Sequence, residues 1–104
     1  MREQQEEVAE FIEENELGGT TPFRIMDLVS EVGEIVKDAT KTADYGQSPE
    51  DLEVKEEEIG DAMFSLLAVS EDLGIDSEEA LEKAMEKYRR RIEEKGEAGS
   101  GSHS

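Results

Sequence analysis

Apolar residues recur every three or four positions along most of this 104-residue chain. That spacing places them on one face of an α-helix, whereas a half-buried strand would need them at every second position. Only two prolines interrupt the pattern, and the length suits one domain with a modest core. The sequence therefore predicts an all-α protein built as a four-helix bundle, with a single domain over residues 1–95.

Residues that typically end or begin helices separate the four predicted segments. The first helix, about Glu3–Asn15, stops near Gly18-Gly19. A threonine N-cap with proline at the first helical position begins the second, and a loop with glycine, serine and proline follows it. Gly74 suits a C-cap, and Asp76 with Glu79 suits a capping box before the fourth helix. The remaining helices are predicted over about Pro22–Thr42, Glu50–Leu73 and Ser77–Lys95.

The third predicted helix is apolar on nearly every side from Ala62 to Val69. Such a segment must be enclosed, and a chain of this size cannot enclose it alone. We therefore expect a homodimer, or a homotetramer, to complete the bundle. The residues from Gly96 onward alternate glycine and serine, which predicts a disordered tail over 96–104 that resembles an expression tag.

The charge balance is strongly acidic, with 29 acidic residues against 11 basic ones and a formal net charge of −18. Such a chain is not expected to bind nucleic acid through a broad basic surface. The excess acid suits a halophilic source, where salt screens self-repulsion; an acidic protein of an ordinary cytosol is the alternative. There is no cysteine and no long apolar run, and Met1–Glu7 lacks the features of a signal peptide. We expect a cytoplasmic protein that does not enter a membrane.

Two short segments, Glu31–Glu34 and Glu58–Asp61, have the same arrangement: two acids three positions apart, with a β-branched residue and a glycine between them. Acids at that spacing lie on one helix face. Glycine inside a helix costs about 1 kcal/mol relative to alanine, and close approach of two helices would explain it. We therefore expect Gly33 and Gly60 to let the two helices meet, so that the flanking carboxylates converge.

Converging carboxylates raise one another's pKa values, and a divalent cation relieves that conflict. Ligand sets made only of oxygen select hard ions, Mg²⁺ first and Mn²⁺ next. A solvated acidic surface is the alternative, because similar acid pairs occur elsewhere in this chain. The predicted metal ligands are Glu31, Glu34, Glu58 and Asp61.

Magnesium commonly bridges protein carboxylates and substrate phosphates, so basic residues are expected opposite the acids. Lys87 and Arg91 are four positions apart on the fourth helix, share a face, and could bind one polyphosphate substrate. Pairing with acids of their own helix is the alternative. The fourth helix holds six of the eleven basic residues, and five of them lie close together: Lys83, Lys87, Arg89, Arg90 and Arg91.

The acidic segments and the residues after them resemble the MazG-like all-α nucleotide pyrophosphohydrolases. Members of that superfamily carry E-E-x-x-E on one helix and E-x-x-D on the next; here Ser30 stands in place of the first glutamate. The likeness extends over roughly Phe23 to Arg91. The matching segments are Ser30–Glu34, Glu58–Asp61, Phe64–Ala68, Leu73–Asp76 and Glu79–Lys83.

The resemblance implies an enzyme that uses Mg²⁺ to cleave a nucleoside triphosphate to the monophosphate and pyrophosphate, as housekeeping of the nucleotide pool. It assigns the metal to the four acids named above and the substrate phosphates to Lys87 and Arg91. A carboxylate would take the proton of the attacking water. The candidates for this base are Glu34, Glu57 and Glu58.

Three other readings stay open. A phosphoribosyl-ATP pyrophosphohydrolase would share the fold and the metal acids. A non-catalytic acidic helical interaction module would use the same carboxylates only for solvation. Because Ser30 departs from the motif, a protein that binds nucleotide without turnover is the third.

Overall fold

A computed structural model describes residues 1–95, and this part of the chain folds into four α-helices and one short 3-10 helix without a strand. The all-α prediction is thereby confirmed, whereas the tail predicted over 96–104 lies outside the described residues. In chain order the elements are α1 (Arg2–Glu14), α2 (Thr21–Thr42), η1 (Pro49–Asp51), α3 (Glu56–Asp72) and α4 (Ser77–Lys95).

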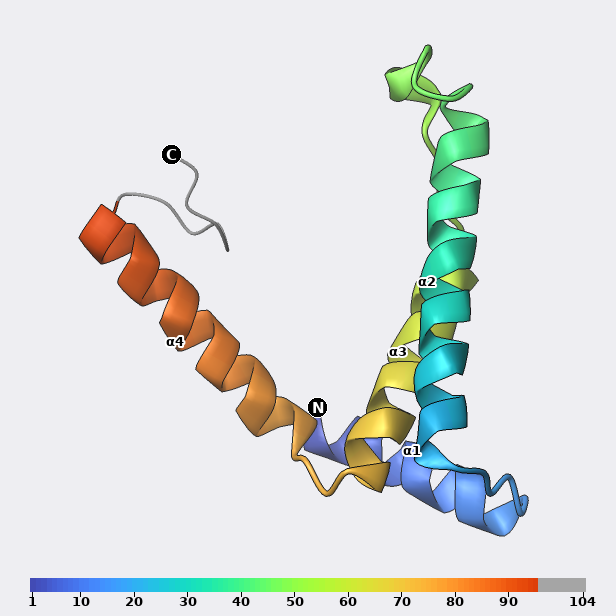
Figure 1. Cartoon of the computed structure of the whole chain (residues 1–104), viewed down its shortest axis with the longest axis vertical. Coiled ribbons are helices and arrows are strands. Elements are labelled where there is room, and N and C mark those ends of the chain that lie inside the picture. The colour runs from blue at the N-terminus through green and yellow to red at the C-terminus, as the bar shows by residue number, and fades with distance from the viewer. Residues whose placement is uncertain (96–104) are drawn as a thin grey trace.

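Helices α2 and α3 run antiparallel, side by side, and form the central hairpin of the molecule (Figure 1). Helix α1 crosses one end of this hairpin, and the ring of Phe11 packs edge-on against Phe64 with centroids 5.9 Å apart. Three of the four buried apolar residues of the described chain, Leu67, Ala68 and Val69, lie in α3 near this crossing, and the fourth is Ala43 after α2. Helices α1 and α2 cover only part of the continuously apolar segment of α3, because Met63 and Leu66 remain 46% and 50% exposed.

Helix α4 diverges from the central hairpin and forms an open angle with it (Figure 1). The Cα radius of gyration is 16.8 Å, against about 13 Å for a compact domain of this length. Within one chain the four helices therefore do not close into a bundle. The apolar stripe of α4 remains exposed, with exposed fractions of 49% for Leu81, 42% for Met85, 37% for Tyr88 and 53% for Ile92.

The turn between α3 and α4 contains the predicted glycine C-cap and half of the predicted capping box, since Asp76 caps α4 while the Glu79 side chain pairs with Lys83. Gly74 adopts φ +68°, and the N–H of Ile75 donates to the carbonyl of Ser70 at 2.9 Å. These features define a Schellman motif, in which glycine tolerates the left-handed conformation. Asp76 Oδ1 then accepts the N–H of Glu78 at 2.9 Å, and that of Glu79 at 3.2 Å, at the start of α4.

Gln5 fixes this turn to α1. Its side chain is buried, donates from Nε2 to the carbonyl of Ile75 at 2.9 Å, and accepts the N–H of Ser77 at 2.8 Å. The guanidinium of Arg2 adds ion pairs to Asp76 and Glu78. The direction in which α4 leaves the hairpin is therefore set by a network of bonds.

The third helix begins later than predicted, at Glu56 instead of about Glu50. The segment before it is held out of the helix because the N–H of Glu53 donates to Thr42 Oγ1, 2.7 Å away at the end of α2. Lys55, with ψ 141°, is still extended. At the start of α2, Thr20 is the N-cap without a side-chain bond, and proline occupies the second helical position instead of the first.

Helix α1 ends before the predicted glycine pair. Glu16 takes the left-handed conformation at φ 51°, and the N–H of Leu17 donates to the carbonyl of Ile12 at 2.9 Å. A glutamate thus holds the position that glycine usually occupies after a helix. None of the described helices combines the length and the apolar character needed to cross a bilayer.

Candidate metal centre

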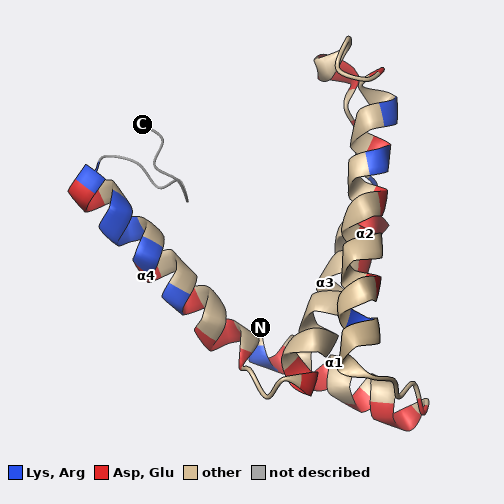
Figure 2. Ribbon diagram, in the orientation of Figure 1, with Lys and Arg blue, Asp and Glu red and all other residues tan. Residues whose placement is uncertain are grey.

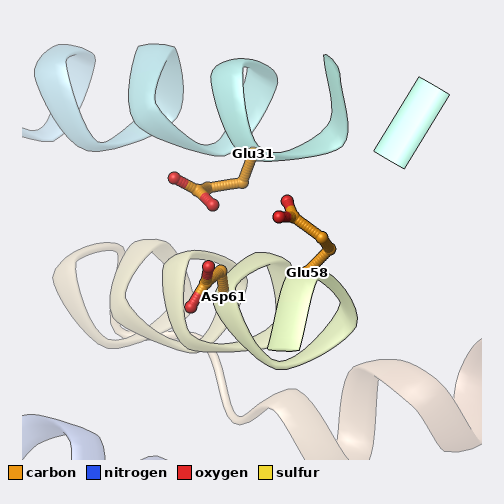
Figure 3. A group of neighbouring side chains, drawn as sticks. All are labelled: Glu31, Glu58 and Asp61. Carbon is orange, nitrogen blue, oxygen red and sulfur yellow. The ribbon is translucent and has the colours of Figure 1, made fainter. Parts of the chain in front are cut away.

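Three carboxylates meet between α2 and α3. Glu31 extends from α2, and Glu58 and Asp61 extend toward it from α3 (Figure 3). One oxygen of each lies within 4.8 Å of the corresponding oxygens of the other two. Ligand atoms around a common Mg²⁺ or Ca²⁺ lie about 3–5 Å apart, given metal–oxygen distances of about 2.0–2.6 Å. These three residues, the acidic cluster, are therefore spaced to hold one hard cation with small side-chain adjustments.

The acidic cluster interrupts the apolar contact between the two helices. On α2, Glu31 lies on the same face as Leu28 and Ile35, and all three are half-buried. On α3, Glu58 is half-buried one turn before Ala62. Moving a carboxylate out of water costs free energy unless an ion or a hydrogen bond compensates. The sequence thus places charge where the packing pattern alone would place an apolar side chain.

The electrostatic setting of Glu58 is unfavourable for its ionised form. Burial raises the pKa of this carboxyl, and the negative charges of Asp38, Glu34 and Asp61 raise it further, while Lys55 lowers it. None of the three cluster carboxylates forms an ion pair within residues 1–95. A bound divalent cation would compensate for the burial of the Glu58 carboxylate and would offset the repulsion between the neighbouring negative charges.

Asp38 is a further acid at this site. Its Oδ2 is buried and has no hydrogen-bond partner in the described part of the chain. It lies seven residues after Glu31, two turns along the same face of α2. The predicted ligand set omitted Asp38, although the seven-residue spacing places it on the right face. An orphaned carboxylate oxygen beside an acidic cluster is the kind of donor that a cation satisfies.

The other predicted acids lie around the cluster. Glu34, one turn beyond Glu31 on α2, is exposed; its charge acts on Glu58, but it is not one of the three residues whose oxygens converge. Glu57 is also exposed and lines a shallow surface depression with Ile59 and Gly60.

The predicted role of the glycines is wrong within this chain. A Cβ built on Gly33 or on Gly60 would meet no neighbouring atom within 4 Å. The reason is geometric, because each glycine follows a cluster acid by two positions and so lies about 200° around the helix from it. Both glycines therefore face outward, and α2 and α3 approach without them.

The predicted phosphate-binding residues Lys87 and Arg91 belong to α4. This helix diverges from the central hairpin (Figure 2). Lys87 Nζ is 5.0 Å from the centroid of the Tyr88 ring, and the guanidinium carbon of Arg91 is 6.0 Å from it. Within one chain, the predicted metal-binding acids therefore lie on α2 and α3, and the predicted phosphate-binding residues lie on α4.

The sequence is similar to that of a known protein. The chain is 34% identical over 96 residues to a protein of Bacillus subtilis (strain 168) named "Uncharacterized protein YpjD", and the match covers 88% of this chain and 85% of the relative. No family model matches the sequence. No solved structure matches it either.

Proposed function

The chain belongs to the family of Bacillus subtilis YpjD, and we propose that it is a Mg²⁺-dependent nucleoside triphosphate pyrophosphohydrolase of the MazG-like type. Such an enzyme cleaves its substrate to a nucleoside monophosphate and pyrophosphate. The observation that supports the proposal most directly is the acidic cluster, whose oxygens lie within 4.8 Å of one another between two helices.

The donors at this site suit a hard divalent ion. Every candidate ligand is a carboxylate oxygen, and Asp38 Oδ2 is buried without a partner in the described residues. Mg²⁺ and Mn²⁺ prefer such oxygen ligands. When bound, the ion would neutralise charge on the phosphate oxygens and lower the pKa of a water molecule. Glu31, Glu58 and Asp61 are the residues that would hold it.

The position of Glu34 suits the proton acceptor of the reaction. It is exposed, lies one helical turn from Glu31, and is close enough to Glu58 for its charge to raise the pKa of that carboxyl. Because it is not part of the cluster, its carboxylate would stay available to a water molecule beside the bound ion. Of the other two candidate bases, Glu58 would be occupied as a ligand, and Glu57 lies outside the cluster.

Lys87 and Arg91 would bind the substrate phosphates, because a chain with a net charge of −18 repels a polyphosphate unless local cations offset the field. The exposed apolar residues on the central hairpin support a homodimer as the active form. The most exposed of them include Phe23, Met26, Val29, Val36 and Leu66.

The test is pyrophosphate release from a panel of canonical and modified triphosphates, with phosphoribosyl-ATP included, in Mg²⁺ at low and at molar salt. We expect Mg²⁺-dependent release that EDTA abolishes. Glu34→Gln should lower turnover while Mn²⁺ still binds, whereas Glu57→Gln should leave turnover close to wild type. Release from phosphoribosyl-ATP alone would identify the enzyme as a phosphoribosyl-ATP pyrophosphohydrolase. Absence of release from every substrate would contradict the proposed activity and favour a non-catalytic binding module.

A further inference from the structure

We infer that Lys37 and Lys41 bind the pyrophosphate part of the substrate, within the same chain that holds the metal ligands. The inference rests on the proposed function, since it gives two residues of α2 a role in that reaction. It adds an in-chain pair of cations to Lys87 and Arg91, and it gives the bound triphosphate a direction along the central hairpin.

The first observation is the position of the two lysines on α2. Lys41 follows Glu34 by seven residues, about two helical turns, and so lies on nearly the same line of the helix. Lys37 lies about one turn from each of them, and both lysines are exposed. Because each Cα–Cβ bond of a helix tilts toward the N-terminus, the two side chains extend back toward Glu34.

The second observation is that this line of α2 borders the open side of the acidic cluster. Asp61 is the exposed member of the cluster, whereas Glu31 and Glu58 are half-buried. Glu34 is exposed as well, and its negative charge is close enough to raise the pKa of Glu58. A phosphate group that reaches the cluster from solvent therefore passes beside Glu34, on the line of α2 that continues to the two lysines.

The third observation is that neither lysine is neutralised within the described chain. Lys37 lies three positions after Glu34, and Lys41 lies three positions after Asp38. Neither ammonium group forms an ion pair with any of residues 1–95. Acids outnumber bases by 29 to 11 in this sequence, so that two lysines without an ion pair beside acids are unexpected. Both ammonium groups are available to an anion.

The spacing of the two lysines favours a bound anion. Like charges four positions apart on one helix face repel each other and destabilise the helix slightly. Lys41 lies in the last turn of α2, where it complements the helix dipole. Lys37 lies before that turn and gains little from the dipole, because the effect is confined to the helix end. A phosphate group between the two side chains would replace their repulsion with charge-assisted hydrogen bonds.

The order of these groups along α2 gives the triphosphate its direction. With its α-phosphate at the acidic cluster, the β- and γ-phosphates extend toward the end of α2 that leads to η1. In the reaction, the oxygen of a water molecule bonds to the α-phosphorus, and its proton passes to Glu34. The bond from the α-phosphorus to the bridging oxygen breaks, and its electron pair leaves with pyrophosphate. Lys37 and Lys41 would stabilise the negative charge that develops on this leaving group.

Binding of inorganic pyrophosphate tests this site without turnover. In isothermal titration with Mg²⁺ present, the dissociation constant of pyrophosphate should rise about 10-fold in Lys37→Ala and in Lys41→Ala, and about 100-fold in the double variant. Each substitution removes a charge-assisted hydrogen bond to phosphate. The charge-retaining double variant Lys37→Arg, Lys41→Arg should stay within about threefold of wild type, because arginine also donates to phosphate.

A matched control removes two positive charges elsewhere. The double variant Lys83→Ala, Lys95→Ala on α4 should change the dissociation constant of pyrophosphate less than about threefold, because salt screens distant charges. Equal effects of this variant and of Lys37→Ala, Lys41→Ala would overturn the inference, and so would a wild type that does not bind pyrophosphate. In Mn²⁺ titration without pyrophosphate, Lys37→Ala, Lys41→Ala should bind the ion as tightly as wild type or more tightly, because it loses nearby positive charge. Weaker Mn²⁺ binding would show that the lysines support the acidic cluster, against the inference.

Protection of lysines from acetylation tests the site in the unaltered protein. Pyrophosphate with Mg²⁺ should slow chemical acetylation of Lys37 and Lys41, measured by mass spectrometry, and should leave the rates at Lys83 and Lys95 unchanged. This measurement also separates the inference from the proposed function. Hydrolysis of triphosphates without protection of Lys37 and Lys41 would refute the inference alone. Protection of both lysines without hydrolysis of any triphosphate would support the pyrophosphate site and refute the proposed activity.

Discussion

Glu31 on α2 and Glu58 on α3 face each other across the central hairpin, with carboxylate oxygens within 4.8 Å. Two like charges at this separation oppose the packing of the helices that carry them. The hairpin therefore has a site at which folding and cation binding are coupled, since a divalent ion converts repulsion into a shared contact.

Glu58→Gln tests this coupling. Without metal, the variant should unfold at a higher temperature than wild type, because it removes one of the charges that gather near Asp38, Glu34 and Asp61. With Mg²⁺, wild type should gain stability and the variant should not. Its affinity for Mn²⁺ should fall at least about 100-fold, since even the outer partners of metal ligands contribute about 10–100-fold.

Thermal unfolding in EDTA and in Mg²⁺, together with Mn²⁺ titration, measures these effects. Glu10→Gln, which neutralises an exposed acid on α1, is the matched control and should change neither quantity. A metal-free Glu58→Gln chain less stable than wild type would contradict the repulsion that we describe.

The pH dependence of stability follows from the same carboxyl. Burial first, and then the neighbouring negative charges, raise the pKa of Glu58 above its ordinary value of 4.5. A group whose pKa rises on folding stabilises the folded chain at low pH, and this contribution is lost as pH rises through the folded pKa. In metal-free urea denaturation, the free energy of unfolding of wild type relative to Glu58→Gln should thus fall as pH rises from about 4 toward neutrality.

Asp76 and Glu78 act in the opposite direction. The hydrogen bond from the Arg2 side chain lowers the pKa of Asp76, and the backbone N–H of Arg2 lowers that of Glu78. Their stabilisation is present above their ordinary pKa values and is lost as pH falls through the folded ones. Wild type and Glu58→Gln both retain Arg2, Asp76 and Glu78. The contribution of these residues therefore cancels when the free energies of unfolding of the two chains are subtracted at each pH. A pH-independent difference between the two chains would count against the raised pKa of Glu58.

The sequence predicted the local features of the fold well, because they depend on neighbouring residues. Gly74 forms the expected C-cap, Asp76 forms its half of the expected capping box, and α4 begins at the predicted residue, Ser77. The start of α3 was predicted too early because the N–H of Glu53 donates to the side chain of Thr42 at the end of α2. The local sequence around Glu53 does not predict such a bond.

The candidate site was predictable in part. The i, i+3 spacing led to Glu58 and Asp61, and the structure places Glu31 opposite them. The outward direction of Gly33 and Gly60 was missed because the glycine pattern does not say which helix face meets a neighbour. The separation of Lys87 from the acids depends on the angle at the α3–α4 turn, which the helix pattern of α4 does not encode.

Asp38→Asn tests whether the orphaned carboxylate belongs to the site. The substitution keeps the size of the side chain and removes a negative charge whose oxygen is buried without a partner in the described chain. We expect Mn²⁺ affinity to fall about 10–100-fold, as for other residues that support metal ligands. Asp27→Asn, an exposed acid on the same helix, should change it far less. Equal effects of the two variants would mean that Asp38 affects Mn²⁺ binding only through the overall negative charge of the protein.

Gln5 tests how α4 is held. Gln5→Ala removes the donor to the carbonyl of Ile75 and the acceptor for the N–H of Ser77, both in the turn that leads into α4. The free energy of unfolding should fall by about 1–3 kcal/mol, because buried polar groups lose their partners. Gln4→Ala, at the exposed neighbouring position, should change it by less than about 0.5 kcal/mol.

The same variant separates the turn from the candidate metal site. Gln5→Ala should leave the affinity for Mn²⁺ unchanged, since the acidic cluster lies on α2 and α3 and not on α4. A parallel loss of Mn²⁺ binding would mean that the substitution disturbs the hairpin itself.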